Sequence, residues 1–229
     1  HTGYTRASNS SWFHYDEFTS ITEIPGDSYV LSGVHDSNEG NLGTDVRWQA
    51  EIIALDLDGA LRWQRRFECE RCLIVDSLIS ADGTTYFAGT ESLLAAADTS
   101  VVWVGSVSRD GEPLWQVKVR DPESDLYSFG IELVDRETLV VAATRETGDG
   151  FESSNLAFSL SGELLWSLSS RSAASDGPGL AAAYHPDGYW LTSHYASDGS
   201  MGIRCVSLDQ SMESWGLETT ETILIGESG

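Results

Sequence analysis

The chain has 229 residues, of which 41% are hydrophobic and 10% aromatic, a composition that predicts a folded globular protein and argues against disorder. Its 36 acidic residues against 13 Lys and Arg give a formal net charge of -23, which argues against nucleic acid and anionic membranes as partners because like charges repel. Cations, basic proteins and neutral glycans stay open as partners.

The N-terminus lacks the character of a signal peptide, and no apolar run approaches the roughly 20 residues that a membrane helix needs. We therefore expect no direct membrane insertion. Because the chain begins at His1 without Met, we expect a processed chain in an extracytoplasmic location (periplasmic, cell-surface or secreted); a fragment boundary is the alternative.

Short strand signals follow one another along the chain, separated by turn signals such as Asp58-Gly59. No apolar period of 3.6 residues runs long enough for a helix. The predicted strands fall at 18–24, 29–33, 48–57 and 61–67; at 73–80, 85–89, 101–108 and 114–119; at 129–134, 139–143, 155–160 and 164–168; and at 180–184, 189–193, 203–208 and 213–217.

A ten-residue marker, Ala54-Leu-Asp-Leu-Asp-Gly-Ala-Leu-Arg-Trp63, returns in variant form along the chain. Its tryptophan recurs at intervals of 51, 52, 51 and 49 residues, at Trp12, Trp63, Trp115, Trp166 and Trp215. A period of this size indicates stacked supersecondary units, and four strands per unit predict a blade of a β-propeller. We expect each marker tryptophan to pack between neighbouring blades.

The expected fold is thus an all-β propeller of four-stranded antiparallel blades, closed with four blades or part of a larger ring. We expect a single domain over residues 1–229. Its parts are a closing outer strand at 1–12, repeats at 13–63, 64–115, 116–166 and 167–215, and a terminal strand at 216–229.

The Ala-x-Asp-x-x-Gly-x-x-x-Trp spacing resembles the repeat of quinoprotein-type (PQQ-like) β-propellers, which include non-enzymatic members such as the BamB-type outer-membrane assembly lipoproteins. The resemblance covers residues 13 to 217 and is best at Ala54, Asp56, Gly59 and Trp63; the fourth copy lacks the glycine. Enzymes of that family hold a calcium-bound quinone among eight blades. This chain has four repeats, and no catalytic aspartate or quinone-stacking residue aligns, so the resemblance implies architecture only.

Long connections between the predicted second and third strands, and between successive repeats, alternate with tight turns at the other ends. Length variation on one face of a repeat protein marks a binding face. We therefore expect a partner-binding or cation-binding face with calcium as the candidate ion. Its candidate acids are Asp36, Glu39, Asp45, Glu91, Asp98, Asp121, Glu123, Asp125, Glu146, Asp149 and Asp198.

Cysteines and histidines give weaker signals. Cys69 and Cys72 form a C-x-x-C pair, which we expect to be a disulfide or structural pair; a zinc half-site and a redox pair are the alternatives. His35 and His194 occupy equivalent places in the first and fourth repeats, where a shared metal site competes with ordinary loop histidines.

No nucleophile elbow, phosphate loop or metalloprotease motif appears, and the acids are too many for a glycosidase pair to be chosen. Strand alternation favours core packing over sugar stacking for the aromatic residues Tyr127, Tyr184, Trp190 and Tyr195. We therefore expect no cofactor and a non-enzymatic propeller that acts as a protein-interaction module or structural subunit through its acidic face. The alternative is a carbohydrate-active or other channel-site enzyme.

Overall fold

The computed structural model describes residues 17–36, 48–69, 71–93, 99–122, 124–134, 136–148, 150–170, 179–185, 189–195 and 201–207. These residues form antiparallel sheets, and none of them is helical. Several predicted features lie outside the described residues: Trp12, Trp215, the fourth strand of the last repeat, and the segments 1–12 and 216–229. No helix in the described part of the chain is long and apolar enough to span a membrane.

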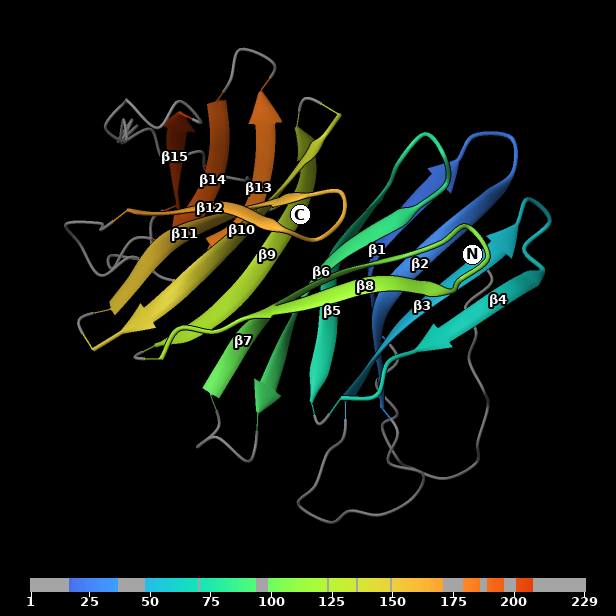
Figure 1. Cartoon of the computed structure of the whole chain (residues 1–229), viewed down its shortest axis with the longest axis horizontal. Helices are drawn as coiled ribbons and strands as arrows, with labels where there is room; N and C mark the ends of the chain where they lie inside the picture. Colours follow the sequence, from blue (N-terminus) through green and yellow to red (C-terminus); the bar gives the residue numbers. More distant parts are fainter. Residues whose placement is uncertain are drawn as a thin grey trace, which may run out of the picture.

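Each sheet takes its strands in sequence order (Figure 1). Sheet A holds β1 (Glu17–Ile24), β2 (Ser28–Asp36), β3 (Trp48–Asp56) and β4 (Leu61–Arg66), and sheet B holds β5 (Cys72–Ile79), β6 (Thr85–Leu93), β7 (Thr99–Val107) and β8 (Pro113–Val119). Sheet C holds β9 (Asp125–Val134), β10 (Thr138–Thr147), β11 (Gly150–Ser159) and β12 (Leu164–Ser170), and sheet D holds β13 (Gly179–His185), β14 (Tyr189–Tyr195) and β15 (Met201–Ser207).

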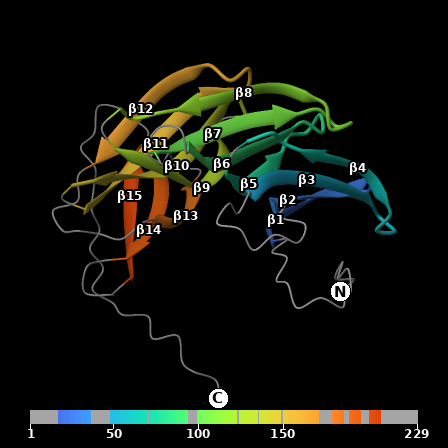
Figure 2. The same cartoon turned by 90° about the horizontal axis from the view of Figure 1, so that it is seen from below.

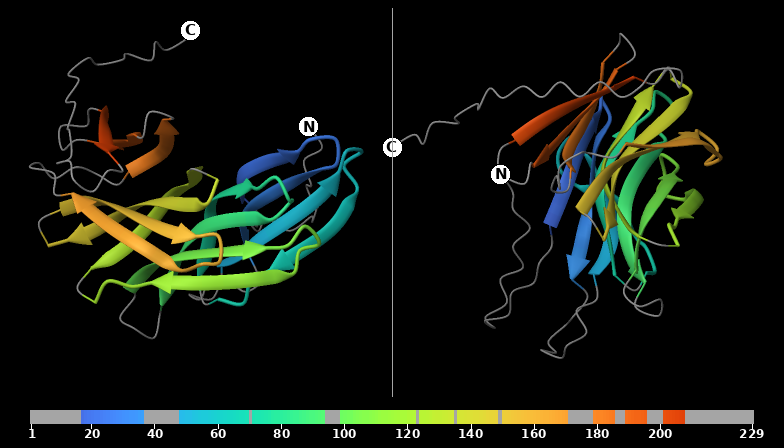
Figure 3. Two further views of the ribbon diagram at one scale, coloured as in Figure 1. Left: turned by 45° about the horizontal axis from the view of Figure 1, so that its top comes forward. Right: turned by 90° about the vertical axis from the view of Figure 1, so that its left-hand side faces the viewer.

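The four sheets follow one another in an arc, with the first strand of each sheet on the inner side and β4, β8 and β12 on the outer side (Figure 2). Strand β5 contacts β1 and β9, and β9 contacts β13, so the first strands are neighbours although some 50 residues separate them in sequence. The described sheets do not close into a ring, because sheets A and D lie apart at the two ends of the arc (Figures 2 and 3). The prediction of an all-β fold of four-stranded antiparallel sheets is confirmed.

Sheet B is buried on both faces because its side chains alternate between two apolar clusters. Phe87 and Trp103 point into the cluster shared with sheet A, where their ring centroids lie 4.7 Å apart. Their chain neighbours Ala88 and Val104 point into the cluster shared with sheet C. This explains why the sequence of β7, TSVVWVGSV, is almost continuously apolar and small instead of alternating.

Tight turns join the second pair of strands in sheets A, B and C, as the marker predicts. In sheet A, the Oδ1 atom of Asp56 accepts hydrogen bonds from the backbone N–H groups of Asp58 (3.0 Å) and Ala60 (2.7 Å). Gly59 has a φ of 83°, a conformation that is strained for residues with a Cβ atom. The marker therefore encodes a hairpin with a side-chain acceptor and a glycine at fixed places.

The marker tryptophan ties its sheet to the turn of the next sheet. Trp63 donates its Nε1–H to the carbonyl oxygen of Arg109 (2.8 Å), and its ring lies so close to Gly111 that a Cβ atom there would be 2.7 Å from it. Trp115 repeats this arrangement with Leu160 (2.9 Å) and Gly162. A tie of this kind needs only a hairpin glycine and an indole, so any repeated sheet protein can use it.

A β-bulge interrupts the first strand of each sheet. The register shifts leave Thr19, Val75 and Phe129 as the extra residues in β1, β5 and β9. On the second strand, Gly33 and Gly89 lie against the bulges, where a Cβ atom would be 2.0 Å from the oxygen of Glu17 and 2.3 Å from that of Leu73. Since bulges redirect side chains, these positions determine what the inner edge of the arc presents.

Candidate active site at the inner strands

Because neighbouring strands are antiparallel, β2, β6 and β10 finish at the same end of their sheets, where β3, β7 and β11 begin. We call this the loop end, since the longer connections of sheets A and B leave from it. In sheet C the expected long loop is wrong, because β10 and β11 pair as far as Thr147 and Gly150, which places Glu146 in a strand. The opposite end carries the tight marker turns. The candidate acids can therefore be located relative to the loop end of the sheets.

The acids of sheet C are engaged in contacts within the protein. Asp121 and Glu152 both pair with Arg145, at 2.8 and 3.7 Å. Asp125 accepts a hydrogen bond from the backbone N–H of Ser100 at 2.6 Å. Glu146 accepts one from the Tyr127 hydroxyl at 3.1 Å. These carboxylates thus hold the local backbone and the Tyr127 ring.

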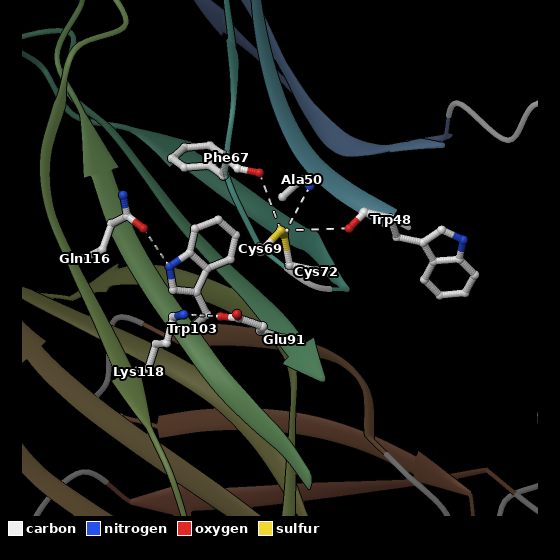
Figure 4. The surroundings of a disulfide bond; sticks show 9 residues. All are labelled: Trp48, Ala50, Phe67, Cys69, Cys72, Glu91, Trp103, Gln116 and Lys118. Carbon is white, nitrogen blue, oxygen red and sulfur yellow. Dashed lines mark hydrogen bonds and ion pairs between the residues drawn. A yellow bond between two sulfur atoms is a disulfide. The ribbon is translucent and has the colours of Figure 1, made fainter. Parts of the chain in front are cut away.

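The structure places Glu91 in a strand and not in the predicted loop. It lies within β6, its side chain is buried, and its carboxylate contacts Lys118 of β8 at 2.5 Å (Figure 4). Strand β6 extends this far because its last residues pair with the first residues of β7. Glu91 therefore belongs to an ion pair inside sheet B.

Three further candidates lie on strands. Asp36 is the last residue of β2 and His194 lies in β14, and for these two only the backbone is described; His35 lies in β2 and is partly buried with partners of its own. Within the described residues, no group of three His, Cys, Asp or Glu could hold a metal ion. The others lie outside the described residues: Glu39, Asp45, Asp98, Glu123, Asp149 and Asp198.

A cleft of about 770 Å³ opens at the loop end between the starts of β3, β5, β9 and β11 and the finishing residues of β6 and β10. Four aromatic residues line it, and two charged residues, Arg71 and Glu146, lie among them. Burial raises the pKa of Tyr127, with the nearby charges of Asp125 and Glu146 acting in the same direction, so its hydroxyl stays protonated and donates to Glu146. The aromatic residues are Trp48, Tyr127, Phe129 and Phe151.

Two carboxyl groups lie where β5 and β9 run side by side. Asp76 directly follows the bulged Val75, itself a residue of the cleft. Its carboxylate accepts hydrogen bonds from the backbone N–H groups of Ser77 (2.8 Å) and Ile131 (3.2 Å). Burial nevertheless raises the pKa of Asp76.

Glu132 is the second member of this carboxyl pair. Burial raises its pKa, and the negative charge of Asp76 raises it further, which places the two groups within electrostatic reach. Buried acidic groups with raised pKa values are candidates for general acid–base chemistry. Glycoside hydrolysis uses a pair of carboxyl groups.

No sequence motif marks this pair, although a signal was present. Asp76 stands in the largely apolar run Leu73-Ile-Val-Asp-Ser-Leu-Ile79, and Glu132 follows Phe-Gly-Ile in β9. A charged residue inside an apolar strand is costly unless something compensates for its burial. That these two groups come within electrostatic reach follows only from the contact of β5 with β9.

Cys69 and Cys72 are joined by a disulfide at the edge of the cleft (Figure 4). Cys72 is buried and accepts a hydrogen bond from the backbone N–H of Ala50 at 3.2 Å. The sulfur of Cys69 lies 3.8 Å from the carbonyl oxygen of Trp48, whose indole points away from it. The C-x-x-C segment is thus a closed loop held against the start of β3.

No known protein family matches this sequence, and no curated protein does. The fold is similar to the crystal structure of an endo-arabinase from Bacteroides thetaiotaomicron, with a TM-score of 0.51 and 15% sequence identity over 86% of this chain and 77% of that chain. At this identity the similarity concerns the fold alone. The chain therefore has an all-β fold of repeated antiparallel sheets, and an endo-arabinase has a similar fold.

This finding corrects two expectations. The resemblance to quinoprotein-type propellers is wrong, because the structural similarity is to an endo-arabinase and the marker encodes a hairpin and an indole tie that do not identify a family. The expectation of a non-enzymatic interaction module is also wrong, since the similar structure is that of a carbohydrate-active enzyme.

Proposed function

We propose that this chain is a carbohydrate-active enzyme whose inner strands supply an acid and a base and whose loop-end cleft binds the sugar chain. The observation that carries the proposal is the placement of two partly buried carboxyl groups on neighbouring first strands, Asp76 directly after the cleft residue Val75 in β5 and Glu132 in β9. Burial raises the pKa of both groups. The fold shared with an endo-arabinase supports a glycan as the substrate class. The aromatic lining of the cleft supports the same class, because sugar rings stack on aromatic faces.

Asp76 and Glu132 have different environments, and this assigns their roles. Asp76 accepts two backbone hydrogen bonds, which favour its ionised form, whereas Glu132 experiences the charge of Asp76. Glu132 is accordingly the group that retains its proton and acts as the general acid. Asp76 is the carboxylate that activates water or stabilises positive charge on the sugar.

The proposed architecture is a β-propeller in which each sheet is one blade. Its support is the arc of sheets with first strands innermost and the repeated tryptophan tie. The separation of sheets A and D supports an arc that forms part of a larger ring over a closed ring of four blades. The disulfide Cys69–Cys72 supports an extracytoplasmic location, where disulfides persist.

Hydrolysis of polysaccharides by the purified chain tests this proposal. We expect release of reducing ends from at least one member of a panel that includes arabinan, xylan and mannan. Asp76→Asn and Glu132→Gln should each lower the rate by roughly 10²- to 10⁴-fold, the usual contribution of an acid or base. Glu137→Gln, at an exposed turn at the opposite end of sheet C, is the matched control and should leave the rate unchanged.

Two results would overturn it. One is an absence of product from every polysaccharide by a chain that melts cooperatively. The other is full activity in both carboxyl variants, which would place the chemistry elsewhere. Melting curves of the variants distinguish lost chemistry from lost folding.

A further inference from the structure

Arg71 lies inside the loop that the Cys69–Cys72 disulfide closes, and it lines the aromatic cleft. Its backbone is fixed from the other side, because its carbonyl oxygen accepts a hydrogen bond from the N–H of Ser92 at 2.8 Å. The covalent loop and this bond hold Arg71 between the start of β5 and the end of β6. The C-x-x-C motif thus has a role that redox or zinc chemistry does not explain: it positions an arginine.

The guanidinium group of Arg71 lacks the partner that comparable cations have. Its Nε atom is inaccessible to solvent and forms no hydrogen bond, and the side chain forms no ion pair with any residue in the described part of the chain. Other cations in these sheets contact carboxylates, namely Arg62, Arg65, Arg66, Arg109, Lys118 and Arg145.

A partly buried arginine without a partner is costly, and this chain has 36 acidic residues from which a partner could have been drawn. Arg71 is one of the residues that line the cleft of about 770 Å³, which is large enough for several sugar rings. A ligand in the cleft can therefore supply an acceptor that the described residues do not. A guanidinium group has five N–H donors and no acceptor, and sugar hydroxyl oxygens accept such hydrogen bonds.

We infer that Arg71, held by the disulfide loop, is the residue of the cleft that binds sugar hydroxyl groups and selects a neutral oligosaccharide. The inference rests on the proposed function and names its substrate class. A neutral ligand is favoured over an acidic one because the cleft is lined by one cation, Arg71, and one carboxylate, Glu146, and the chain as a whole has a net charge of -23, which repels anions. Trp48, 44% exposed, supplies a stacking face beside the loop.

Binding measurements test this inference separately from catalysis. Isothermal titration uses arabino-, xylo- and manno-oligosaccharides of six sugars, and an oligogalacturonate of the same length as the acidic probe. We expect at least one neutral probe to bind more tightly than the acidic probe. Arg71→Met, which keeps the apolar stem, should weaken binding by roughly 10- to 100-fold, the loss expected for a charge-assisted hydrogen bond. Arg71→Lys should recover part of it.

The exposed Arg120, which lies outside the cleft, provides the control Arg120→Met, and this variant should bind as the wild type does. Reduction of the disulfide should weaken binding by the wild type but cause no further loss in Arg71→Met, because both changes remove the same contact. Equal binding by Arg71→Met and the wild type overturns the inference, as does tighter binding of the oligogalacturonate or no binding of any neutral probe.

The two proposals fail in different ways. Tight, Arg71-dependent binding without release of reducing ends would reject the hydrolase and keep the inference. Hydrolysis that is unaffected by Arg71→Met in both KM and kcat would reject the inference and keep the hydrolase. Melting temperatures close to that of the wild type would show that the Arg71 variants lost a contact and not the fold.

Discussion

The outer and inner edges of the sheets are joined by different chemistry. At the outer edge, Trp63 and Trp115 make the same contact, an indole on the next sheet's hairpin glycine with one hydrogen bond to a backbone carbonyl. At the inner edge the contacts change from one junction to the next. Thr19 of β1 donates to the carbonyl oxygen of Ile74 at 2.6 Å, whereas Asp76 of β5 accepts from the N–H of Ile131.

Equivalent positions after the bulge make this difference clear. Ser20 follows the bulge in β1, Asp76 follows it in β5, and Gly130 follows it in β9. A repeat that served stability alone would keep one small residue here, as the outer edge keeps its tryptophan. The outer edge therefore stabilises the arc. The inner edge, where the residues differ from one repeat to the next, carries the candidate chemistry.

Removing an outer tie should have the largest effect on stability. Trp115→Ala deletes the ring that packs on Gly162, its hydrogen bond to Leu160 and its contact with the Tyr86 ring at a centroid distance of 6.2 Å. We expect a loss of about 3 kcal/mol in the free energy of unfolding, at the lower end of the range for large aromatic truncations because the side chain is only partly buried. Urea unfolding measures it, and a loss below about 1 kcal/mol would contradict the stabilising role.

Two hairpin glycines test the contribution of the indole contact, with a smaller expected loss of stability. Gly59 and Gly111 have nearly equal φ angles, 83° and 81°, but a Cβ atom at Gly59 meets nothing within 4 Å whereas one at Gly111 meets the Trp63 ring. Gly59→Ala should cost about 1–2 kcal/mol from backbone strain alone. Gly111→Ala should cost roughly 2 kcal/mol more, because the indole must move. Equal losses in urea unfolding would mean that the ring contact contributes nothing.

The smallest expected effect is on how stability depends on pH. It concerns two acids whose pKa values are shifted in opposite directions. The raised pKa of Asp76 means that its contribution to stability is present below its ordinary pKa of 3.8 and is lost as pH rises through the raised value. Asp27, which contacts Arg62 and Arg109, has a pKa of about 2, so its contribution is present above 3.8 and is lost as pH falls toward about 2.

We therefore expect Asp76→Asn to remove the decline in stability on the alkaline side of pH 3.8, and Asp27→Asn to remove a decline on the acid side. Denaturation midpoints measured between about pH 2 and pH 7 check both slopes. The Asp27 slope should be shallow because the group is exposed to solvent. An unchanged profile for Asp76→Asn would show that its carboxyl group is not held in an unfavourable environment.

Much of the local structure was predictable because its determinants lie close together in sequence. Alternating apolar residues gave the strands, and Asp58-Gly59 gave the hairpin. Tyr127 was expected in the core because of strand alternation, but it lies two residues before the bulged Phe129 and lines the cleft. A bulge shifts alternation by one residue, and the sequence contains no clear signal for it.

The strands, their turns and the recurring indoles follow from residues within one repeat, and the amino-acid sequence therefore suffices to predict them. The candidate site depends on contacts between repeats. Asp76 and Glu132 are 56 positions apart and come within electrostatic reach because β5 lies beside β9, and Arg71 lines the cleft at a loop that a disulfide closes. Contacts between repeats depend on how whole sheets pack, and that packing is settled by the two apolar clusters that enclose sheet B.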